Sequence, residues 1–464
     1  MATADLEETT VDSFSDQVRG EVLRPGEEGY DEARTVWNGM IDKEPTVIAR
    51  CAGAADVMAA VNFARDLDLL LAVKGGGHNV AGKAVCDGGL MIDLSPMNNV
   101  RVDPNAQTAR VGGGATWGDF DHEAQAFGLA TTGGIVSSTG VAGLTLGGGL
   151  GHLSKKYGLA HDNLRSVDLV TADGELVHAS EDENPELFWG IRGGGGNFGV
   201  VTSFEFDLHE IGPEVLSGPI LHRYEDAADA FRFYRDFMID ASDEIQCYVA
   251  FAKASPELGL PESLHGETIF ILLPTYAGDV SEGKEALQPL REFGDPIVDG
   301  VQPMPYTELQ GFADERWEEG ARYYWRSHVF DEPTDEAIET IVEYCDSSAP
   351  FMSVFNDGWL GGAIARADDD ATAFPHRDKA FTLTIGMKWT DPGRDDEQIA
   401  WAREFHEALE PYASDGVYVN LLDRDEDERV PDAYGEWYER LRELKREWDP
   451  DNLFRVNQNI EPAD

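Results

Sequence analysis

Three glycine-rich segments in the N-terminal half constrain this chain of 464 residues more than any other feature. The first is Lys74-Gly-Gly-Gly-His78-Asn79, with Gly82 close behind, and it follows the short apolar run 69–73. The second spans 131–151 and the third 191–202. Consecutive glycines let several backbone N–H groups point into one concavity, which suits a pyrophosphate group without side-chain charge. The alternative for the first segment is a tight turn that carries a surface histidine.

A dinucleotide-binding loop of the Rossmann type is a competing interpretation of the glycines at 147–151. That loop belongs in the first strand-to-helix turn of its domain, with an acidic residue at a strand end about 20 residues later. The segment 147–151 comes too late in the chain, and no such acidic residue follows in the expected frame. The sequence therefore favours glycine-lined contact with a large planar ligand or with another backbone.

The pattern of apolar residues predicts an α+β fold. We expect residues 1–20 to form a disordered or loosely docked arm. Up to residue 208, helical periodicity covers 52–67 and 117–127, and strands are predicted at 69–73, 90–94, 100–102, 108–111 and 199–208. Residues 164–178 should form a hairpin that turns at Asp173-Gly174.

Glycine clusters become rarer between about 211 and 425, which indicates a second domain. Helices are expected near 225–240, 280–293, 334–346 and 395–410, and strands near 245–252, 267–273, 350–355, 380–388 and 416–421. A charged amphipathic helix should run from Tyr434 to Trp448 and end at Asp449-Pro450. We predict four segments: an N-terminal arm 1–29, a cofactor domain 30–208, a substrate domain 209–425 with an antiparallel sheet, and a C-terminal segment 426–464 that completes the cofactor domain.

The charge balance is extreme, with 88 acidic against 36 basic residues and a net charge of −52. The acids are spread along the chain, which favours a folded protein adapted to molar salt, where the Debye length falls to about 3 Å. A basic partner is the alternative, whereas nucleic acid is a poor partner for such a surface. No membrane span or signal peptide is recognisable, so we expect a cytoplasmic protein. The four cysteines are scattered, and neither a metal site nor a disulfide framework is expected.

Taken together, the motifs resemble those of the berberine bridge enzyme-like family, within the vanillyl-alcohol oxidase and p-cresol methylhydroxylase superfamily. The match runs from about residue 30 to the C-terminus, in the family's order. The loop 74–82 resembles the family's pyrophosphate loop, 147–163 its second flavin segment, 188–202 its third, and 434–460 the C-terminal segment that gives the family its name. The resemblance implies a two-domain fold with a PCMH-type FAD-binding domain, and FAD between the domains.

The resemblance also implies a covalent bond from a ring nitrogen of His78 to the flavin. Some members add a second bond from a cysteine, but that position is Val136 here, so a single link is expected. Lys74 replaces the family's usual arginine and keeps the charge while losing bidentate geometry. The FAD contacts implied for this chain are Lys74, Gly75, Gly76, Gly77, Asn79, Gly82, Ser138, Thr139, Gly140, Gly143, Gly147, Gly151, Tyr157, Gly158, Asp162, Asn163, Gly199, Val201, Asn457 and Asn459.

For the catalytic base, Val417-Tyr418-Val419-Asn420 resembles a family segment that carries a tyrosine. Tyr418 is therefore the candidate, although a free tyrosine has a pKa near 10 and needs help from a cation or a second hydroxyl. The alternative is a strand tyrosine with a satisfied hydroxyl group. The glutamate of the plant alkaloid enzymes falls near Thr384, which is no base but faces the substrate in this interpretation.

The residue that controls oxygen access in the family aligns with Thr139, whose small side chain favours an oxidase. We therefore expect an FAD-linked enzyme that oxidises an alcohol-type carbon of a sugar, a secondary alcohol or a related small molecule, with O2 as acceptor. A dehydrogenase with another acceptor and a flavin-binding protein with little turnover are the alternatives. The sequence leaves the oligomeric state open.

Overall fold

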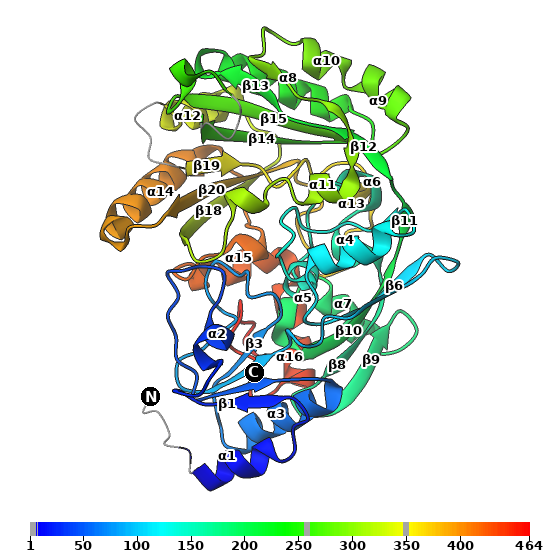
Figure 1. The fold of residues 1–464 in the computed structure, drawn as a ribbon, viewed down its shortest axis with the longest axis vertical. Coiled ribbons are helices and arrows are strands. Elements are labelled where there is room, and N and C mark those ends of the chain that lie inside the picture. The colour runs from blue at the N-terminus through cyan, green and yellow to red at the C-terminus, as the bar shows by residue number, and fades with distance from the viewer. Residues whose placement is uncertain (1–5, 7, 255–259, 347–351) are drawn as a thin grey trace.

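The computed structural model describes residues 6, 8–254, 260–346 and 352–464. Helices and mainly antiparallel sheets alternate along the chain, which confirms the α+β prediction. Figure 1 shows a nine-stranded sheet with its helices in the upper half of the molecule and a four-stranded and a five-stranded sheet in the lower half. A further, two-stranded sheet pairs β7 (Leu129–Ala130) with β11 (His209–Glu210). No helix within the described ranges has the length and apolar character needed to cross a membrane.

The first small sheet has four strands in the order β1-β2-β4-β3. Its strands β2 and β3 both pair in parallel with β4, and helix α3 connects β2 to β3. The expected helix at 52–67 and the strands near 69–73 and 90–94 are therefore confirmed. The elements are α1 (Glu8–Ser15), β1 (Glu21–Leu23), α2 (Tyr30–Arg34), β2 (Val47–Arg50), α3 (Ala54–Asp66), β3 (Leu71–Lys74) and β4 (Leu90–Asp93).

The second small sheet is antiparallel, in the order β5-β6-β10-β8-β9, and contains the predicted hairpin as β8 and β9. Short helices lie in the long connection between β6 and β8. The elements are β5 (Val100–Asp103), β6 (Thr108–Gly112), α4 (Trp117–Gln125), β7 (Leu129–Ala130), α5 (Val141–Leu146), α6 (Ser154–Tyr157), β8 (Leu164–Val170), β9 (Leu176–Ser180), α7 (Pro185–Ile191), β10 (Val200–Asp207) and β11 (His209–Glu210).

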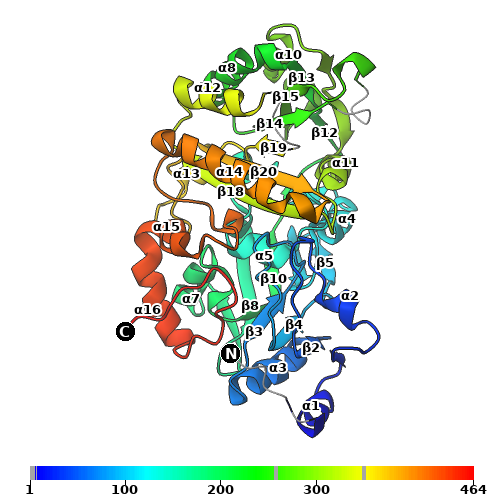
Figure 2. The same cartoon turned by 90° about the vertical axis from the view of Figure 1, so that its left-hand side faces the viewer.

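The large sheet has nine strands, with seven in the order β16-β13-β15-β14-β19-β20-β18; β12 also pairs with β15, and β17 pairs with β12. Helices α8, α12 and α14 lie along one side of it in Figure 2 and bury apolar side chains such as Phe231, Ile338 and Phe405. Its strands are β12 (Glu214–Ser217), β13 (Ile220–Arg223), β14 (Ile245–Lys253), β15 (Thr268–Tyr276), β16 (Val298–Asp299), β17 (Gln302–Pro305), β18 (Arg322–Phe330), β19 (Met352–Phe355) and β20 (Phe381–Trp389). The remaining helices are α8 (Ala227–Asp240), α9 (Val280–Ala286), α10 (Gln288–Glu292), α11 (Tyr306–Gln310), α12 (Asp335–Tyr344), α13 (Ala363–Arg366), α14 (Asp395–Leu409), α15 (Val430–Tyr434) and α16 (Tyr438–Trp448).

Four expectations from the sequence need correction. The predicted strand 416–421 is an extended segment followed by a short 3-10 turn, Val419–Leu421, because this stretch packs between elements and joins no sheet. Several strands were not predicted, among them β2, β12, β13 and β18. The N-terminal arm contains α1, which docks through Phe14 stacked on Phe63 with ring centroids 4.3 Å apart. The C-terminal helix starts at Tyr438, because Gly435 with φ 48° interrupts the chain between α15 and α16. Residues 350–351 of the expected strand 350–355 lie outside the described residues.

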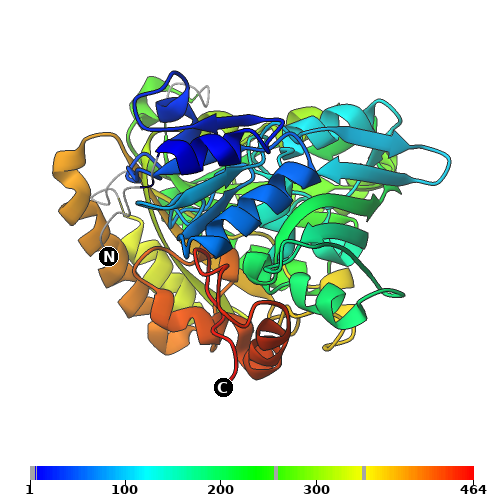
Figure 3. The ribbon, with the colours of Figure 1, turned by 90° about the horizontal axis from the view of Figure 1, so that it is seen from below.

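The C-terminal segment is bound to the third glycine segment by the buried side chain of Lys445. The Lys445 ammonium lies 2.6 Å from a carboxylate oxygen of Asp449 and donates to the carbonyl oxygens of Asn197 (2.7 Å) and Phe454 (3.0 Å). Seen from below in Figure 3, the red C-terminal helix lies beside the green part of the chain that contains α7. Two parts of the sequence some 250 residues apart are thereby held together.

Candidate active site

A cavity of about 330 Å³ opens where the glycine segments, the large sheet and the C-terminal segment meet. The loop after β3, the segment 134–150, the turn 195–201, strands β18 and β19, the segment 418–421 and the tail 454–458 all contribute to its lining. The predicted site residues that it brings together are Gly75, Gly76, Gly77, His78, Asn79, Thr139, Gly140, Gly143, Gly147, Gly199, Val201, Tyr418 and Asn457.

Close backbone approach explains several of these glycines. A Cβ atom on Gly76 would lie 2.4 Å from the backbone nitrogen of Gly140, so the first and second glycine segments touch without side chains between them. A Cβ atom on Gly143 or Gly196 would meet nothing within 4 Å, and both residues line the cavity. Glycine therefore serves two purposes here: it lets the segments meet, and it leaves room for a ligand against bare backbone.

His78 stands at the end of the first glycine loop. Its Nε2 atom lies 2.9 Å from the hydroxyl oxygen of Ser138, and its ring stacks on Trp37 with centroids 4.6 Å apart. Burial lowers the pKa of His78 to about 4, so the imidazole is neutral near pH 7. A neutral imidazole keeps a lone pair on one ring nitrogen, which is the chemical requirement for bonding to an electrophilic carbon.

Tyr418 is buried against the second glycine segment. Its phenolic oxygen accepts hydrogen bonds from the backbone N–H of Gly149 (2.9 Å) and from the side-chain amide of Asn420 (2.7 Å). Burial raises the pKa of Tyr418, and these two donors oppose that rise because they stabilise the phenolate. Two amide groups stand where the sequence called for a cation or a second hydroxyl group, and they offset the effect of burial only in part, because the pKa of Tyr418 remains above its ordinary value.

A carboxyl group that the sequence reasoning missed shares this cavity. Asp357 follows β19, and one of its oxygens accepts from the hydroxyl groups of Thr384 (2.8 Å) and Thr382 (3.4 Å). Burial raises the pKa of Asp357 to about 6. The charge of Asp357 also raises the pKa of Tyr418, so the two groups are close enough to interact. The available signal was a lone acidic residue two positions after a predicted apolar strand and directly before Gly358.

Thr384 is fully buried on β20 and does not line the cavity. Its hydroxyl group points to Asp357, so its contact with the cavity runs through that carboxyl group. Lys74 is similarly turned away: its ammonium donates to the carbonyl oxygens of Ala33 and Thr35, both at 2.8 Å. Lys74 thereby ties the first glycine loop to the N-terminal segment.

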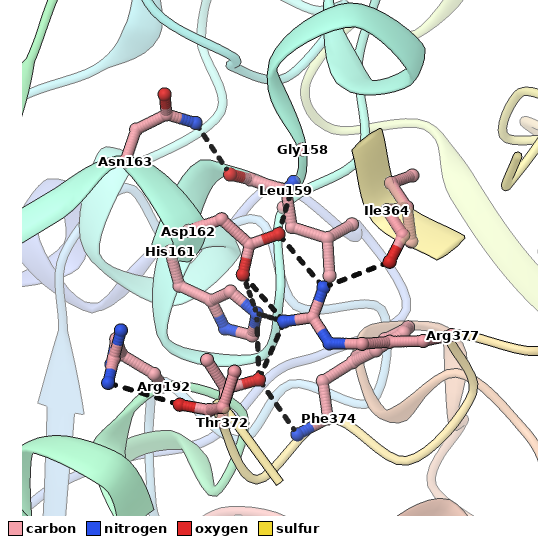
Figure 4. Close-up of polar contacts among 12 residues, drawn as sticks. Gly158, Leu159, His161, Asp162, Asn163, Arg192, Ile364, Thr372, Phe374 and Arg377 are labelled. Atoms are coloured by element: carbon pink, nitrogen blue, oxygen red, sulfur yellow. Dashed lines mark hydrogen bonds and ion pairs between the residues drawn. The ribbon is translucent and has the colours of Figure 1, made fainter. Parts of the chain in front are cut away.

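Several further predicted residues form a separate polar network (Figure 4). The guanidinium of Arg377 binds both carboxylate oxygens of Asp162, at 2.6 Å and 3.0 Å, and the side-chain amide of Asn163 donates to the carbonyl oxygens of Tyr157 and Leu159. Arg377 is 2% exposed. The predicted residues that do not line the cavity are Lys74, Gly82, Ser138, Gly151, Tyr157, Gly158, Asp162, Asn163, Thr384 and Asn459.

The C-terminal tail carries three neighbouring amide side chains with unused acceptors. The side-chain oxygens of Asn457, Gln458 and Asn459 are buried and have no hydrogen-bond partner among the described residues. Buried polar atoms are almost always paired in native proteins, so these acceptors call for donors that the polypeptide does not supply. A ligand with several hydroxyl or amino groups, such as FAD, fits this requirement and the bare glycine backbone on the other side of the cavity.

These features fit the class of flavin-dependent enzymes. Comparisons with known proteins give the same class. The model of an FAD binding domain matches residues 45–180, and the model described as berberine and berberine like matches residues 417–461. An (R)-6-hydroxynicotine oxidase of Paenarthrobacter nicotinovorans is 33% identical over 96% of this chain and 97% of its own length. A xylooligosaccharide oxidase of Thermothelomyces thermophilus is 30% identical, over 92% and 89% of the two chains.

Among solved structures, the crystal structure of 6-hydroxy-D-nicotine oxidase from Arthrobacter nicotinovorans superposes with a TM-score of 0.87. It is 31% identical and covers 96% of this chain and 98% of that one. The chain belongs to the berberine bridge enzyme-like family of FAD-linked oxidoreductases, and it is an enzyme of that class.

Proposed function

We propose that this protein binds one FAD in the cavity, through a single covalent link from His78. The observation that carries the proposal is a neutral imidazole at the end of a glycine loop, beside bare backbone. Val136 lines the same cavity at the position where some family members carry a second linking cysteine. The backbone N–H groups of Gly75 to Asn79, with Gly140 and Gly143, would hold the diphosphate. Asn457 and the neighbouring Gln458, which both line the cavity, would bind ribityl or adenine groups, while Asn459 stands outside its lining.

The reaction that we propose is oxidation of an alcohol-type carbon. FAD supplies an acceptor for hydride at flavin N5 when it is bound. The residues of this chain then have to take the hydroxyl proton of the substrate. Tyr418 is suited to this role because two amide donors are ready to stabilise the phenolate that remains when it has lost its own proton. Asp357, which is ionised at neutral pH, is a second acceptor for that proton.

O2 is the electron acceptor in this proposal. Thr139 lines the cavity, and its small side chain leaves space that a larger residue would fill. Two relatives that are at least 30% identical carry names of oxidases. A dehydrogenase with another acceptor is the second candidate, and a flavin-binding protein with little turnover is the third.

We further propose a salt-adapted protein that works in the cytoplasm, because the net charge of −52 is spread over the chain and no membrane-spanning segment was recognised in the sequence. The proposed organisation is a cofactor domain from 30–208 and 426–464 with a substrate domain from 209–425, after an arm of 1–29. The assignment of β12 to β20 to one sheet supports this division.

The test is anaerobic bleaching of the flavin in concentrated salt by a panel of sugars and alcohols, followed by admission of oxygen. Bleaching followed by rapid recovery of the absorbance supports the oxidase. Bleaching without recovery favours the dehydrogenase. A flavin that no member of the panel bleaches favours the binding protein.

A further inference from the structure

One part of the cavity lining is an aromatic wall, formed by Trp37, Trp317, Trp325 and Phe355. The ring of Trp317 lies 5.7 Å from that of Trp325 and 5.4 Å from that of Phe355, measured between centroids. Trp37 lies 5.5 Å from Trp325. These four residues come from the N-terminal segment, the connection before β18, β18 itself and β19, so only the folded chain assembles them.

The aromatic wall is fixed in place and reaches the linking histidine. The indole N–H of Trp37 donates to the carbonyl oxygen of Trp317 at 2.8 Å. On one face Trp37 stacks on Tyr323 with a centroid distance of 3.8 Å, and it also stacks on His78 at 4.6 Å. Rings held by such mutual contacts form a preformed surface. A flat ligand binds to it without the entropy cost of ordering the side chains.

Few of the described residues that line the cavity around the aromatic wall carry a charge. Of the described residues that line the cavity, Asp357 and Lys83 are the ones with ionisable acid or amine side chains. The ammonium of Lys83 lies 2.7 Å from a carboxylate oxygen of Asp427 and is engaged there. Asp357 stands two residues after Phe355, so the carboxylate belongs to the same region as the aromatic wall. A substrate carboxylate would meet this negative charge, and the one amine among the described lining residues is already paired with Asp427.

We propose that the substrate of this enzyme is a compact alcohol that carries a planar, aromatic ring and no negative charge. The inference rests on the proposed function. The ring would stack against the indoles of the aromatic wall, and the carbinol hydroxyl would reach Tyr418 and Asp357. An oligosaccharide fits this region less well, because the aromatic wall offers its many hydroxyl groups a single buried, unpaired polar group among the described residues, the indole N–H of Trp325.

Four probe compounds test how the aromatic ring, its planarity and the charge of the substrate contribute to binding. They are benzyl alcohol, its saturated counterpart cyclohexylmethanol, mandelate, which is a benzylic alcohol with a carboxylate, and cellobiose. Binding to the flavin-loaded protein is measured under anaerobic conditions as the change in flavin absorbance, and reduction as bleaching. We expect benzyl alcohol to bind about tenfold more tightly than cyclohexylmethanol, as ring stacking of this kind predicts. Mandelate and cellobiose should bind more weakly still.

Substitutions in the aromatic wall, compared with a control substitution outside the cavity, test whether the wall binds the ring. Trp317→Leu and Trp325→Leu should each weaken the binding of benzyl alcohol about tenfold while changing that of cyclohexylmethanol less. Trp401→Leu is the control, because Trp401 lies on α14, packs against Phe405 and does not line the cavity. Retention of the flavin absorbance in each variant shows that the protein is folded.

The inference is overturned if mandelate or cellobiose binds as tightly as benzyl alcohol, if no ring alcohol perturbs the flavin, or if the aromatic-wall variants behave as Trp401→Leu does. Its failure is distinct from failure of the proposed function. A protein that cellobiose bleaches keeps the proposed function and loses this substrate class, whereas a folded protein that takes up no FAD loses both.

Discussion

The hydroxyl oxygen of Tyr418 lies 2.9 Å from the backbone nitrogen of Gly149, although 269 residues separate the two in sequence. The second glycine segment therefore contributes a donor to the candidate base as well as part of the cavity wall. Asn420 completes the pair of donors and packs against Gly147, where a Cβ atom would lie 2.1 Å from its side-chain oxygen. The glycine at 147 makes room for the amide that holds the tyrosine.

Replacement of the tyrosine tests this arrangement. Tyr418→Phe keeps the ring and removes the proton acceptor, so we expect flavin reduction to slow by about 10²–10⁴-fold, the usual contribution of a general base. Asn420→Ala should have a smaller effect, because Gly149 remains as a donor. Stopped-flow reduction with saturating substrate measures both. An unchanged rate in Tyr418→Phe would remove this residue from the proposed role.

The carboxyl group of Asp357 predicts a pH dependence. Its pKa of about 6 lies above the ordinary 3.8, so the carboxylate is lost as the pH falls below 6. If the ionised form is needed, the rate of reduction should fall by about tenfold for each pH unit below that value. Asp357→Asn should be slow and should lack this limb. A wild-type profile that stays flat from pH 7 to pH 5 would contradict the prediction.

The linkage through His78 is tested by denaturation. His78→Ala should bind FAD that acid precipitation releases into the supernatant, whereas the wild-type precipitate stays yellow. Ser138→Ala serves as the control, since it removes the hydroxyl group beside Nε2 but keeps the imidazole. A yellow precipitate from His78→Ala would place the covalent bond elsewhere.

The ion pair between Arg377 and Asp162 is buried, so removal of one partner should be costly. Arg377→Met leaves an unpaired carboxylate next to His161 and should lower the free energy of unfolding by about 3–5 kcal/mol. The double variant Arg377→Met with Asp162→Asn should recover a large part of that loss, because it leaves no buried charge. Denaturant titration of all three proteins in the same salt gives the comparison, and equal losses in the single and double variants would argue against a charge effect.

Asp121 offers a prediction about stability. It lies buried on α4 near Tyr306, and one oxygen accepts from the side-chain amide of Gln310 at 2.9 Å. Burial raises its pKa from 3.8 to about 7. The folded protein therefore keeps this proton to a higher pH than the unfolded chain does, so the contribution of Asp121 to stability falls as the pH rises from about 4 to about 7. Asp121→Asn should remove that fall. The difference in unfolding free energy between the two proteins, measured across this range, should grow with pH; a constant difference would contradict the prediction.

Local patterns predicted much of this protein, and the limits of the prediction have a physical origin. The glycine loops and His78 were recognised because backbone conformation at glycine is decided within a few residues. Asp357 was missed because its importance comes from burial beside Thr384 and Tyr418, which only the packed sheet creates. The segment 416–421 was misjudged as a strand because apolar residues at this length fit a strand and a buried turn equally well. The aromatic wall draws on four separate segments, and nothing in any one of them indicates the other three.

The contact between Gly76 and Gly140 means that the glycine segments tolerate few substitutions, whereas the aromatic wall tolerates many. A methyl group at either position would force the two backbones apart and carry His78 away from Ser138. The aromatic wall is less constrained, because its ring contacts are between side chains, apart from the hydrogen bond from the Trp37 indole to the Trp317 carbonyl oxygen. An engineer who wished to give this scaffold a new substrate would redesign the wall and leave the two glycines alone.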